Sequence, residues 1–229
     1  MEYNVNLIFE DVINLINSNI DKINKLRFTT NMKSDNTPVT DADKYVESLI
    51  KTYLQNKITG LFFIGEETYN GEIIVDSPVA ILDPIDGTEN FCSGLKEWGV
   101  SLSLWNGKSH LGSMLYLPEL NLRLLSGDKI KYLNSRIDAF SSNNIDKIIP
   151  NIKNESQCRI MGCSVYNIFN VIHGSYRSFT NPTGAYVWDI IAGLQLAIEH
   201  GCKVFVEDEP YRGMFLSPDK KYRIKIIRD

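Results

Sequence analysis

The feature that most constrains this chain is a short segment, residues 79–91, in which an apolar run ends in two carboxylates. Val79–Leu82 is uniformly apolar, which predicts a short buried strand. Asp83 and Asp86 follow it, with Pro84 between them. Because proline cannot continue the hydrogen-bond ladder of a strand, we expect a stiff turn to begin here.

The turn after Asp86 has residue types that suit a bound cation and a bound anion. Gly87 permits a backbone angle or a close approach that a side chain would block. Thr88 could cap a helix or donate its hydroxyl to a bound group. Hard divalent cations prefer oxygen ligands, so the carboxylates and the Ile85 carbonyl form a candidate cation site, and free N–H groups at a helix start would attract an anion. Taken alone, the segment is equally consistent with an acidic surface turn.

Two further carboxylates in the first half of the chain lie at the ends of predicted elements. Thr40 and Asp43 have the spacing of a capping box at the start of a helix over residues 42–54, and Asp43 has a catalytic role only if it faces the turn described above. Glu66 comes just after the apolar strand Leu61–Ile64, and the end of a strand is a common place for a site in α/β proteins. The structural alternatives are that Thr40 and Asp43 only cap the helix and that Glu66 only belongs to a charged turn.

In the second half, two predicted helix starts carry polar groups. Gly162, Cys163 and Ser164 form a small-residue turn into a helix, which is either an anion or hydroxyl site or simply a tight connection. Cys163 has no histidine in an obvious partner position, so a thiol nucleophile is disfavoured. Asp189 lies in the first turn of a helix that runs to Glu199, where the helix dipole also favours a carboxylate.

The remaining pattern predicts helices and mixed sheets. Apolar residues recur at helical spacing over residues 5–26, which predicts one amphipathic helix. Trp98–Trp105 alternates between two faces, and Asn106-Gly107 is a signal for a type I′ hairpin that leads into a return strand. We expect further strands at 73–75, 110–117, 122–125, 159–161, 176–179, 203–206 and 222–227, with irregular structure over 126–158 and a loop over 180–184.

Composition excludes several classes of protein. The net charge is −4 and there is no basic block, which argues against a nucleic-acid binder. The four cysteines show no CxxC spacing, as is typical of reduced thiols in a cytoplasmic protein. The start of the chain is not basic, and no apolar run reaches about 18 residues, so we expect neither a signal peptide nor a membrane span.

Three motifs in this order, GEE at 65–67, DPIDGT at 83–88 and WDIIAG at 188–193, resemble the inositol monophosphatase family. This family comprises magnesium-dependent, lithium-sensitive phosphomonoesterases, and the resemblance extends from about residue 33 to residue 206. It implies an α/β (α+β) fold, a layered α-β-α-β-α sandwich with two mixed or antiparallel sheets, and a homodimer. We expect a single unit over 1–229, with a metal-binding half over approximately 1–140 and an α/β half over 141–229.

The resemblance also implies the metal ligands. Glu66, Asp83 and the carbonyl of Ile85 would hold a first Mg²⁺ ion. Asp83, Asp86 and Asp189 would hold a second ion, and Glu66 would share a third, more weakly bound ion.

Catalytic and substrate-binding roles follow from the same resemblance. Thr88, hydrogen-bonded to Asp43, would orient a metal-bound water, and Glu66 completes the catalytic set. The backbone N–H groups of Gly87 and Thr88 would hold the phosphate. The other expected substrate-binding residues are Gly162, Cys163, Ser164 and Asp189.

The implied activity is Mg²⁺-dependent hydrolysis of a phosphate monoester of a small polyol or sugar, by in-line attack of a metal-activated water. Where inositol-specific members of the family carry a glutamate, residues 181–184 contain no acid, so catalysis is better supported than inositol specificity. A 3′(2′),5′-bisphosphate nucleotidase of the same fold is the alternative, although Glu89 stands where nucleotide-specific members frequently have lysine. A catalytically inactive binding protein is a further alternative. A haloacid-dehalogenase-type phosphatase is excluded, because Asp83 and Asp86 lack its DxD spacing.

Overall fold

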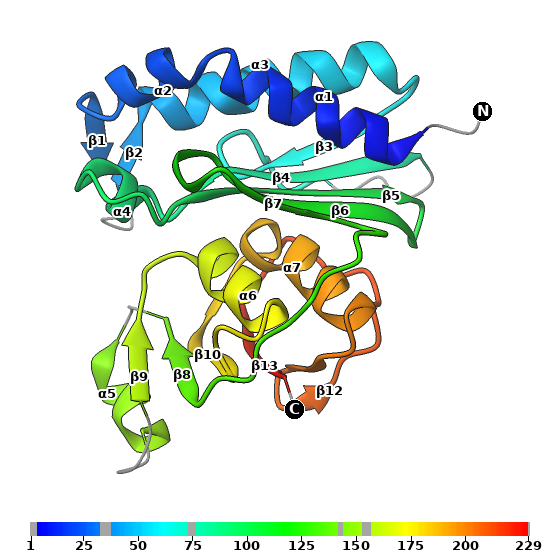
Figure 1. The fold of residues 1–229 in the computed structure, drawn as a ribbon. Helices are drawn as coiled ribbons and strands as arrows, with labels where there is room; N and C mark the ends of the chain where they lie inside the picture. Colours follow the sequence, from blue (N-terminus) through cyan, green and yellow to red (C-terminus); the bar gives the residue numbers. More distant parts are fainter. Residues whose placement is uncertain (1–3, 33–37, 73–76, 142–143, 153–156, 229) are drawn as a thin grey trace.

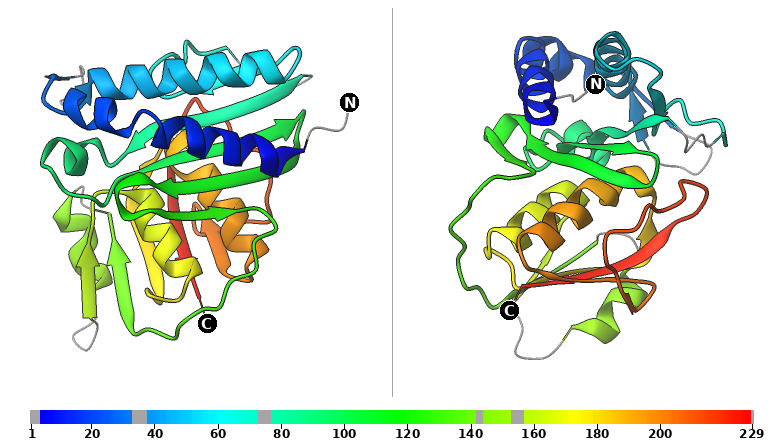
Figure 2. Two further views of the ribbon diagram at one scale, coloured as in Figure 1. Left: turned by 45° about the horizontal axis from the view of Figure 1, so that its top comes forward. Right: turned by 90° about the vertical axis from the view of Figure 1, so that its right-hand side faces the viewer.

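The computed structural model describes residues 4–32, 38–72, 77–141, 144–152 and 157–228, and its helices and sheets stack in five alternating layers (Figures 1 and 2). An outer helical layer covers a five-stranded sheet, a pair of helices lies between that sheet and a six-stranded sheet, and a short helix lies beyond the second sheet. The expected α-β-α-β-α sandwich is therefore confirmed. The helices, layer by layer, are α1 (Val5–Asn17), α2 (Ile20–Leu26) and α3 (Asp41–Lys57); α6 (Ser164–Ile172) and α7 (Val187–Glu199); and α5 (Ile145–Ile148) with the 3₁₀ turn η2 (Ile149–Asn151).

The five-stranded sheet has the order β3-β4-β5-β6-β7, in which β3 is parallel to β4 and the other pairs are antiparallel. Its strands are β3 (Phe62–Gly65), β4 (Pro78–Asp86), β5 (Gly99–Asn106), β6 (Ser109–Leu117) and β7 (Leu122–Leu125). The predicted alternation in β5 is confirmed, but both faces of the sheet are buried. Leu102 packs in the core beneath α1 and α3, whereas Trp105 packs in the core formed with α6 and α7.

The six-stranded sheet has the order β12-β11-β13-β10-β8-β9. Its strands are β8 (Ile137–Phe140), β9 (Gln157–Ile160), β10 (Ser178–Ala185), β11 (Lys203–Val206), β12 (Glu209–Pro210) and β13 (Tyr222–Ile227). Two expectations were wrong here, because β8 lies in the stretch expected to be irregular and β10 continues through the expected loop at 180–184. Pro182 and Gly184 are accommodated because the pairing of β10 with β13 is irregular between Asn181 and Ala185.

The predicted single helix over residues 5–26 is in fact two helices with a break at Ser18 and Asn19. The Ser18 hydroxyl donates to the carbonyl of Asn14 at 2.8 Å, and the Asn19 amide donates to that of Leu15 at 2.8 Å. Side chains that bond to nearby backbone groups in this way compete with helical hydrogen bonding, which explains the break.

The hairpin between β5 and β6 also differs from the expected type. Asn106 pairs with Ser109, so Gly107 and Lys108 form the loop. Of these two, only Gly107 has a positive φ, 60°. A type I′ turn needs positive φ at both central positions, so that prediction was wrong.

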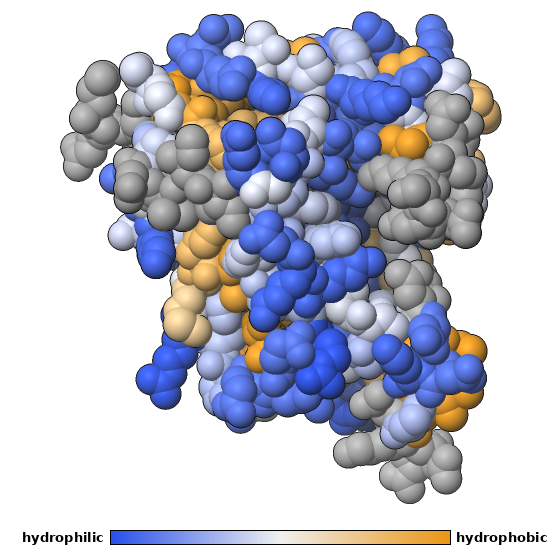
Figure 3. All heavy atoms as spheres, turned by 180° about the vertical axis from the view of Figure 1, so that it is seen from behind, coloured by the Kyte–Doolittle hydropathy of each residue, from blue (hydrophilic) through white to orange (hydrophobic). Residues whose placement is uncertain are grey.

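Three small elements complete the described chain: the ribbon of β1 (Thr30–Met32) and β2 (Pro38–Thr40), the short helix α4 (Thr88–Cys92), and the 3₁₀ turn η1 (Pro118–Leu120). The strand expected at 73–75 lies outside the described residues. Within the described part of the chain, no helix combines the length and the apolar character needed to cross a membrane. On the face opposite the view of Figure 1, hydrophilic residues predominate and apolar residues form only small separate groups (Figure 3).

Candidate active site

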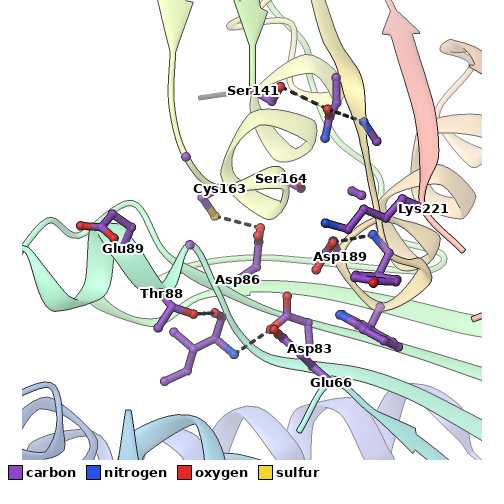
Figure 4. Close-up of a pocket in the computed structure, with 18 of the residues that line it drawn as sticks. Glu66, Asp83, Asp86, Thr88, Glu89, Ser141, Cys163, Ser164, Asp189 and Lys221 are labelled. Atoms are coloured by element: carbon purple, nitrogen blue, oxygen red, sulfur yellow. Dashed lines mark hydrogen bonds between the residues drawn. The ribbon is translucent and has the colours of Figure 1, made fainter. Parts of the chain in front are cut away.

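A cavity of about 670 Å³ lies between the end of β4, the N-termini of α6 and α7, and strand β10 (Figure 4). The predicted metal-binding and substrate-binding residues all line it, namely Glu66, Asp83, Ile85, Asp86, Gly87, Thr88, Gly162, Cys163, Ser164 and Asp189. Asp43 is buried behind this wall and reaches the cavity through Thr88. The structure thus brings together groups that are more than a hundred residues apart in the sequence.

Strand β4 carries the central carboxylates, and it does not end where the sequence predicted. The strand continues through Pro84 to Asp86, so the expectation of a turn beginning at Asp83 was wrong. Its pairing with β5 is irregular between Asp83 and Asp86, which accommodates a residue that has no N–H group. Within this irregular stretch, Oδ1 of Asp83 accepts the N–H of Ile85 at 2.9 Å.

Three carboxylates, those of Glu66, Asp83 and Asp189, have oxygen atoms within 4.8 Å of one another. Asp83 is only 1% exposed, and burial raises its pKa well above the usual range, with further contributions from Glu66, Asp86 and Asp189. Burial also raises the pKa of Asp189 to about 7, and Asp86 adds to this effect, while the N–H of Tyr186, which donates to the Asp189 carboxylate at 2.8 Å, opposes it. Such a cluster needs protons or a cation to offset its mutual repulsion, and its all-oxygen donor set fits a hard divalent cation.

Asp86 is held differently from the other three carboxylates. Its Oδ2 accepts the backbone N–H of Val165 at the start of α6 and lies 3.0 Å from the thiol of Cys163. Burial raises the pKa of Asp86 to about 7, although these two donors lower it. The N-terminus of α6 therefore binds a carboxylate of the chain itself, where the sequence suggested an anion from outside.

The turn at Gly162–Ser164 lines the cavity on the side of α6. Cys163 is the N-cap residue of this helix, and its sulfur accepts the N–H of Tyr166 at 3.3 Å. Burial, together with the neighbouring Asp86, raises the pKa of the Cys163 thiol well above its ordinary value. A thiolate nucleophile is disfavoured on this ground, and the role of the turn in substrate binding stays a prediction.

The capping box at the start of α3 is confirmed, and it is connected to the site. Oδ2 of Asp43 accepts the backbone N–H of Thr40 at 2.7 Å and its hydroxyl at 2.6 Å. The other oxygen, Oδ1, lies 3.2 Å from the hydroxyl of Thr88, which is also 3.0 Å from the carbonyl of Ile85. Asp43 thus caps a helix and orients a side chain of the cavity.

Gly87 joins β4 to α4 with a φ of 84°. A Cβ atom at this position would lie 2.8 Å from that of Cys163, so the turn packs closely against the start of α6. No side chain caps α4, and Thr88 is its first residue rather than its cap. Because the first N–H groups of a helix have no partner within the helix, those at the start of α4 suit a bound anion.

Glu47, which was not predicted from the sequence, supports the loop that carries Glu66. Glu47 is buried, and its Oε2 accepts the N–H of Glu67 at 2.9 Å. A side chain at Gly65 would meet this carboxylate, since its Cβ would lie 2.4 Å from Oε2. Glu47 stands four residues after Asp43, on the same face of α3, and this spacing was the available signal.

Polar residues in or directly beside strands of the second sheet also belong to the site and were not predicted. Ser141, Asn181 and Lys221 line the cavity. Asn181 lies in a segment that was expected to be a loop without an acid, and Lys221 lies far from every motif in the sequence.

The model of the inositol monophosphatase family matches residues 2–133 of the chain. Inositol monophosphatase 2 of Saccharomyces cerevisiae is 32% identical over 197 residues, which cover 71% of this chain and 67% of that protein. Inositol monophosphatase of Mesembryanthemum crystallinum is 27% identical over 199 residues, with 73% and 72% coverage. A shorter match is to histidinol-phosphatase of Mycobacterium tuberculosis, 37% identical over 89 residues, which cover 37% of this chain and 34% of that protein.

Solved structures share the fold across almost the whole chain. An IMPase/NADP phosphatase complexed with NADP and Ca²⁺ superimposes with a TM-score of 0.84 at 19% identity, covering 99% of this chain and 92% of that one. An IMPase/NADP phosphatase complexed with Mg²⁺ and phosphate gives a TM-score of 0.81 at 20% identity, with 97% and 89% coverage. The family match, the yeast relative and the shared fold agree, and the chain belongs to the inositol monophosphatase family of phosphoric monoester hydrolases.

Proposed function

We propose that the protein is a Mg²⁺-dependent phosphatase that hydrolyses a phosphate monoester of a small polyol or sugar. The observation that carries this proposal is the convergence of Glu66, Asp83 and Asp189 within 4.8 Å, in a cavity that also contains the Thr88 hydroxyl. Relatives named inositol monophosphatase and histidinol-phosphatase support the same class of reaction.

The residues that would hold Mg²⁺ are Glu66, Asp83, Asp86, Asp189 and the carbonyl of Ile85. Carboxylate and carbonyl oxygens match the preference of Mg²⁺, and two to three ions would offset the mutual repulsion of the cluster. Bound Mg²⁺ would neutralise the phosphate dianion and lower the pKa of a coordinated water.

The side chains of the chain itself position the other reactants. The Thr88 hydroxyl, oriented by Asp43 and by the carbonyl of Ile85, would hold the attacking water in line with the ester bond. The N–H groups of Gly87 and Thr88 at the start of α4 would bind the phosphate oxygens. Water supplies the oxygen that forms the new bond to phosphorus, the ester bond breaks, and the alcohol leaves with a proton. No covalent intermediate with the chain is involved.

Phosphate release tests this proposal. Purified protein would be assayed with inositol 1-phosphate, histidinol phosphate, fructose 1,6-bisphosphate, 3′-phosphoadenosine 5′-phosphate and sugar 1-phosphates, each with Mg²⁺ and with EDTA. We expect release that requires Mg²⁺ and that favours a polyol or sugar ester over the nucleotide. Release that persists in EDTA, or none from any ester, would overturn the proposal.

Adjacent glutamates provide a matched pair of variants. Glu66→Gln removes a proposed ligand, and we expect it to raise the Mg²⁺ concentration for half-maximal activity at least tenfold. Glu67 does not line the cavity, so Glu67→Gln should stay within about threefold of the wild type. Equal effects of the two substitutions would count against the assignment of Glu66.

The homodimer and the cytoplasmic location stay predictions. Sedimentation of the purified protein tests whether it is a homodimer.

A further inference from the structure

The wall of the cavity formed by β10 presents a hydrogen-bond donor whose orientation is fixed. The Oδ1 atom of Asn181 accepts from the Ser141 hydroxyl at 3.2 Å, the Thr183 hydroxyl at 2.8 Å, the Thr183 N–H at 3.1 Å and the Gly184 N–H at 3.0 Å. Figure 4 shows the bond from Ser141. With the oxygen engaged by these donors, the Nδ2 group is the free end of the amide, and it has no acceptor among the described residues.

Asn181 is only 5% exposed, yet it lines the cavity. Its Nδ2 atom is not fully enclosed by the protein, so a molecule in the cavity can reach it. The hydrogen bonds to Oδ1 fix the orientation of the amide and leave the Nδ2 group for an acceptor on a bound molecule.

Lys221 provides a charge on the same wall. It is the only lysine or arginine among the described residues that line the cavity. Its ammonium group lies 4.9 Å from the centre of the Tyr186 ring, and Figure 4 shows the side chain extending to Asp189, whose pKa it lowers. No described carboxylate forms an ion pair with Lys221.

The backbone places these two donors together. Asn181 pairs with Ile224 and Ala185 pairs with Tyr222, so the irregular stretch of β10 lies opposite the start of β13, directly after Lys221. Gly184, with a φ of 89°, leaves room for the lysine stem, because its Cβ would lie 3.1 Å from that of Lys221. The nearby Asp219 does not compete for the ammonium group, since its two oxygens accept from the hydroxyls of Tyr69 and Ser217.

We propose that Asn181 and Lys221 form a subsite for an anionic group, a carboxylate or a second phosphate, on the alcohol part of the substrate. This inference rests on the proposed function, because it concerns the part of the ester that leaves. An ammonium and an amide N–H are both donors, and charge-assisted hydrogen bonds to an anion are stronger than bonds to a neutral hydroxyl. A plain polyol would offer these donors only neutral hydroxyl groups, whereas an anionic group would form charge-assisted hydrogen bonds with both of them.

Matched pairs of esters test this subsite. Phosphate release would be compared between 3-phosphoglycerate and glycerol 3-phosphate, which differ in a carboxylate, and between fructose 1,6-bisphosphate and fructose 1-phosphate, which differ in a phosphate. We expect kcat/KM to favour the anionic member of at least one pair by about tenfold, mainly through KM. Whichever pair shows the preference identifies the carboxylate or the phosphate as the preferred group.

Variants connect the preference to these side chains. Lys221→Met keeps the apolar stem, and Asn181→Asp keeps an oxygen for the four donors, and each should reduce the preference to about twofold or less. Lys221→Arg should retain most of it. Lys220 is the matched control, since it stacks on Tyr222 and does not line the cavity, and Lys220→Met should leave the preference unchanged.

The outcomes separate this inference from the proposed function. Mg²⁺-dependent release with no preference in either pair, or a preference that survives Lys221→Met, would overturn the subsite and leave the phosphatase proposal intact. If no ester is hydrolysed, the proposed function fails. Each ester is then added in increasing concentration to the protein in the presence of Mg²⁺, and the melting temperature of the protein is measured. A rise in melting temperature with 3-phosphoglycerate or fructose 1,6-bisphosphate that Lys221→Met abolishes would still support the subsite, and no difference between wild type and variant would refute it.

Discussion

Asp83 tests the site at the scale of a single residue. It is buried and lies between the groups proposed to hold the cations, so Asp83→Asn should reduce kcat to below about 1% of the wild type, beyond the effect typical of residues that only orient ligands. Because burial and the neighbouring carboxylates make ionisation of Asp83 costly, and asparagine has nearly the same volume, we expect the metal-free protein to be at least as stable as the wild type. Turnover and denaturant unfolding would be measured side by side. Near-normal turnover would contradict the central role of Asp83.

Gly87 tests the turn that connects the cation site to the start of α6. Gly87→Ala places an alanine at φ 84°, which costs roughly 1–2 kcal/mol, and also brings a Cβ to 2.8 Å from that of Cys163. We expect a loss of stability larger than the backbone cost alone and a loss of activity. Gly94 is the matched control, since its φ is 79° and a Cβ there would meet nothing within 4 Å. Equal effects of Gly87→Ala and Gly94→Ala on unfolding and turnover would mean that the contact with Cys163 is unimportant.

At the scale of an element, the start of α3 combines capping with a connection to the site, and variants can separate the two. Thr40→Ala removes the capping hydroxyl and should lower the free energy of unfolding by about 1 kcal/mol, with most activity retained because the backbone N–H of Thr40 still bonds Asp43. Asp43→Ala removes the partner of Thr88 as well and should lower both stability and turnover. If Asp43→Ala lost only stability, capping alone would account for this carboxylate.

An element could be predicted from the sequence where its local residue pattern agrees with its pairing in the folded protein. The capping box at Thr40, the two faces of β5 and the helix after Cys163 follow directly from residue spacing, and the structure confirms them. The ends of β4 and β10 could not be predicted, because in both strands a proline lies inside a ladder made possible by an irregular register with the neighbouring strand. β8 has few sequence signals of its own, and its pairing with β9 and β10 makes it a strand.

At the scale of the whole molecule, the site lies where the two halves of the sandwich meet. Asp83 and Asp86 come from the first sheet, Asp189 from the start of α7, and the Asn181 and Lys221 wall from the second sheet. The motifs identified the carboxylates, because each follows a predicted strand or begins a predicted helix. They could not identify Lys221, whose position depends on the register between β13 and β10 rather than on any local pattern. The division into a metal-binding half and an α/β half stays a prediction.

The buried carboxylates also link the stability of the whole molecule to pH and to Mg²⁺. In the folded protein the pKa values of Asp86 and Asp189 are raised from 3.8 to about 7, so between about pH 4 and pH 7 the folded state binds more protons than the unfolded state. Without divalent ions, the free energy of unfolding should therefore fall as the pH rises through this window and level off above it. Mg²⁺ bound to the folded protein would take the place of these protons, so it should raise the melting temperature most at pH 7–8 and reduce the slope.

Thermal unfolding between pH 4.5 and 8, in EDTA and in Mg²⁺, measures this dependence. The Asp86→Asn and Asp189→Asn variants should each show a smaller slope in EDTA and a smaller effect of Mg²⁺ than the wild type, because each removes one of the titrating groups. Asp208→Asn is the control, since Asp208 is exposed, forms an ion pair with Arg223 and lies outside the cavity. A slope in EDTA that Mg²⁺ and both cavity variants left unchanged would show that groups elsewhere titrate, and that the carboxylate cluster does not determine how this fold responds to pH.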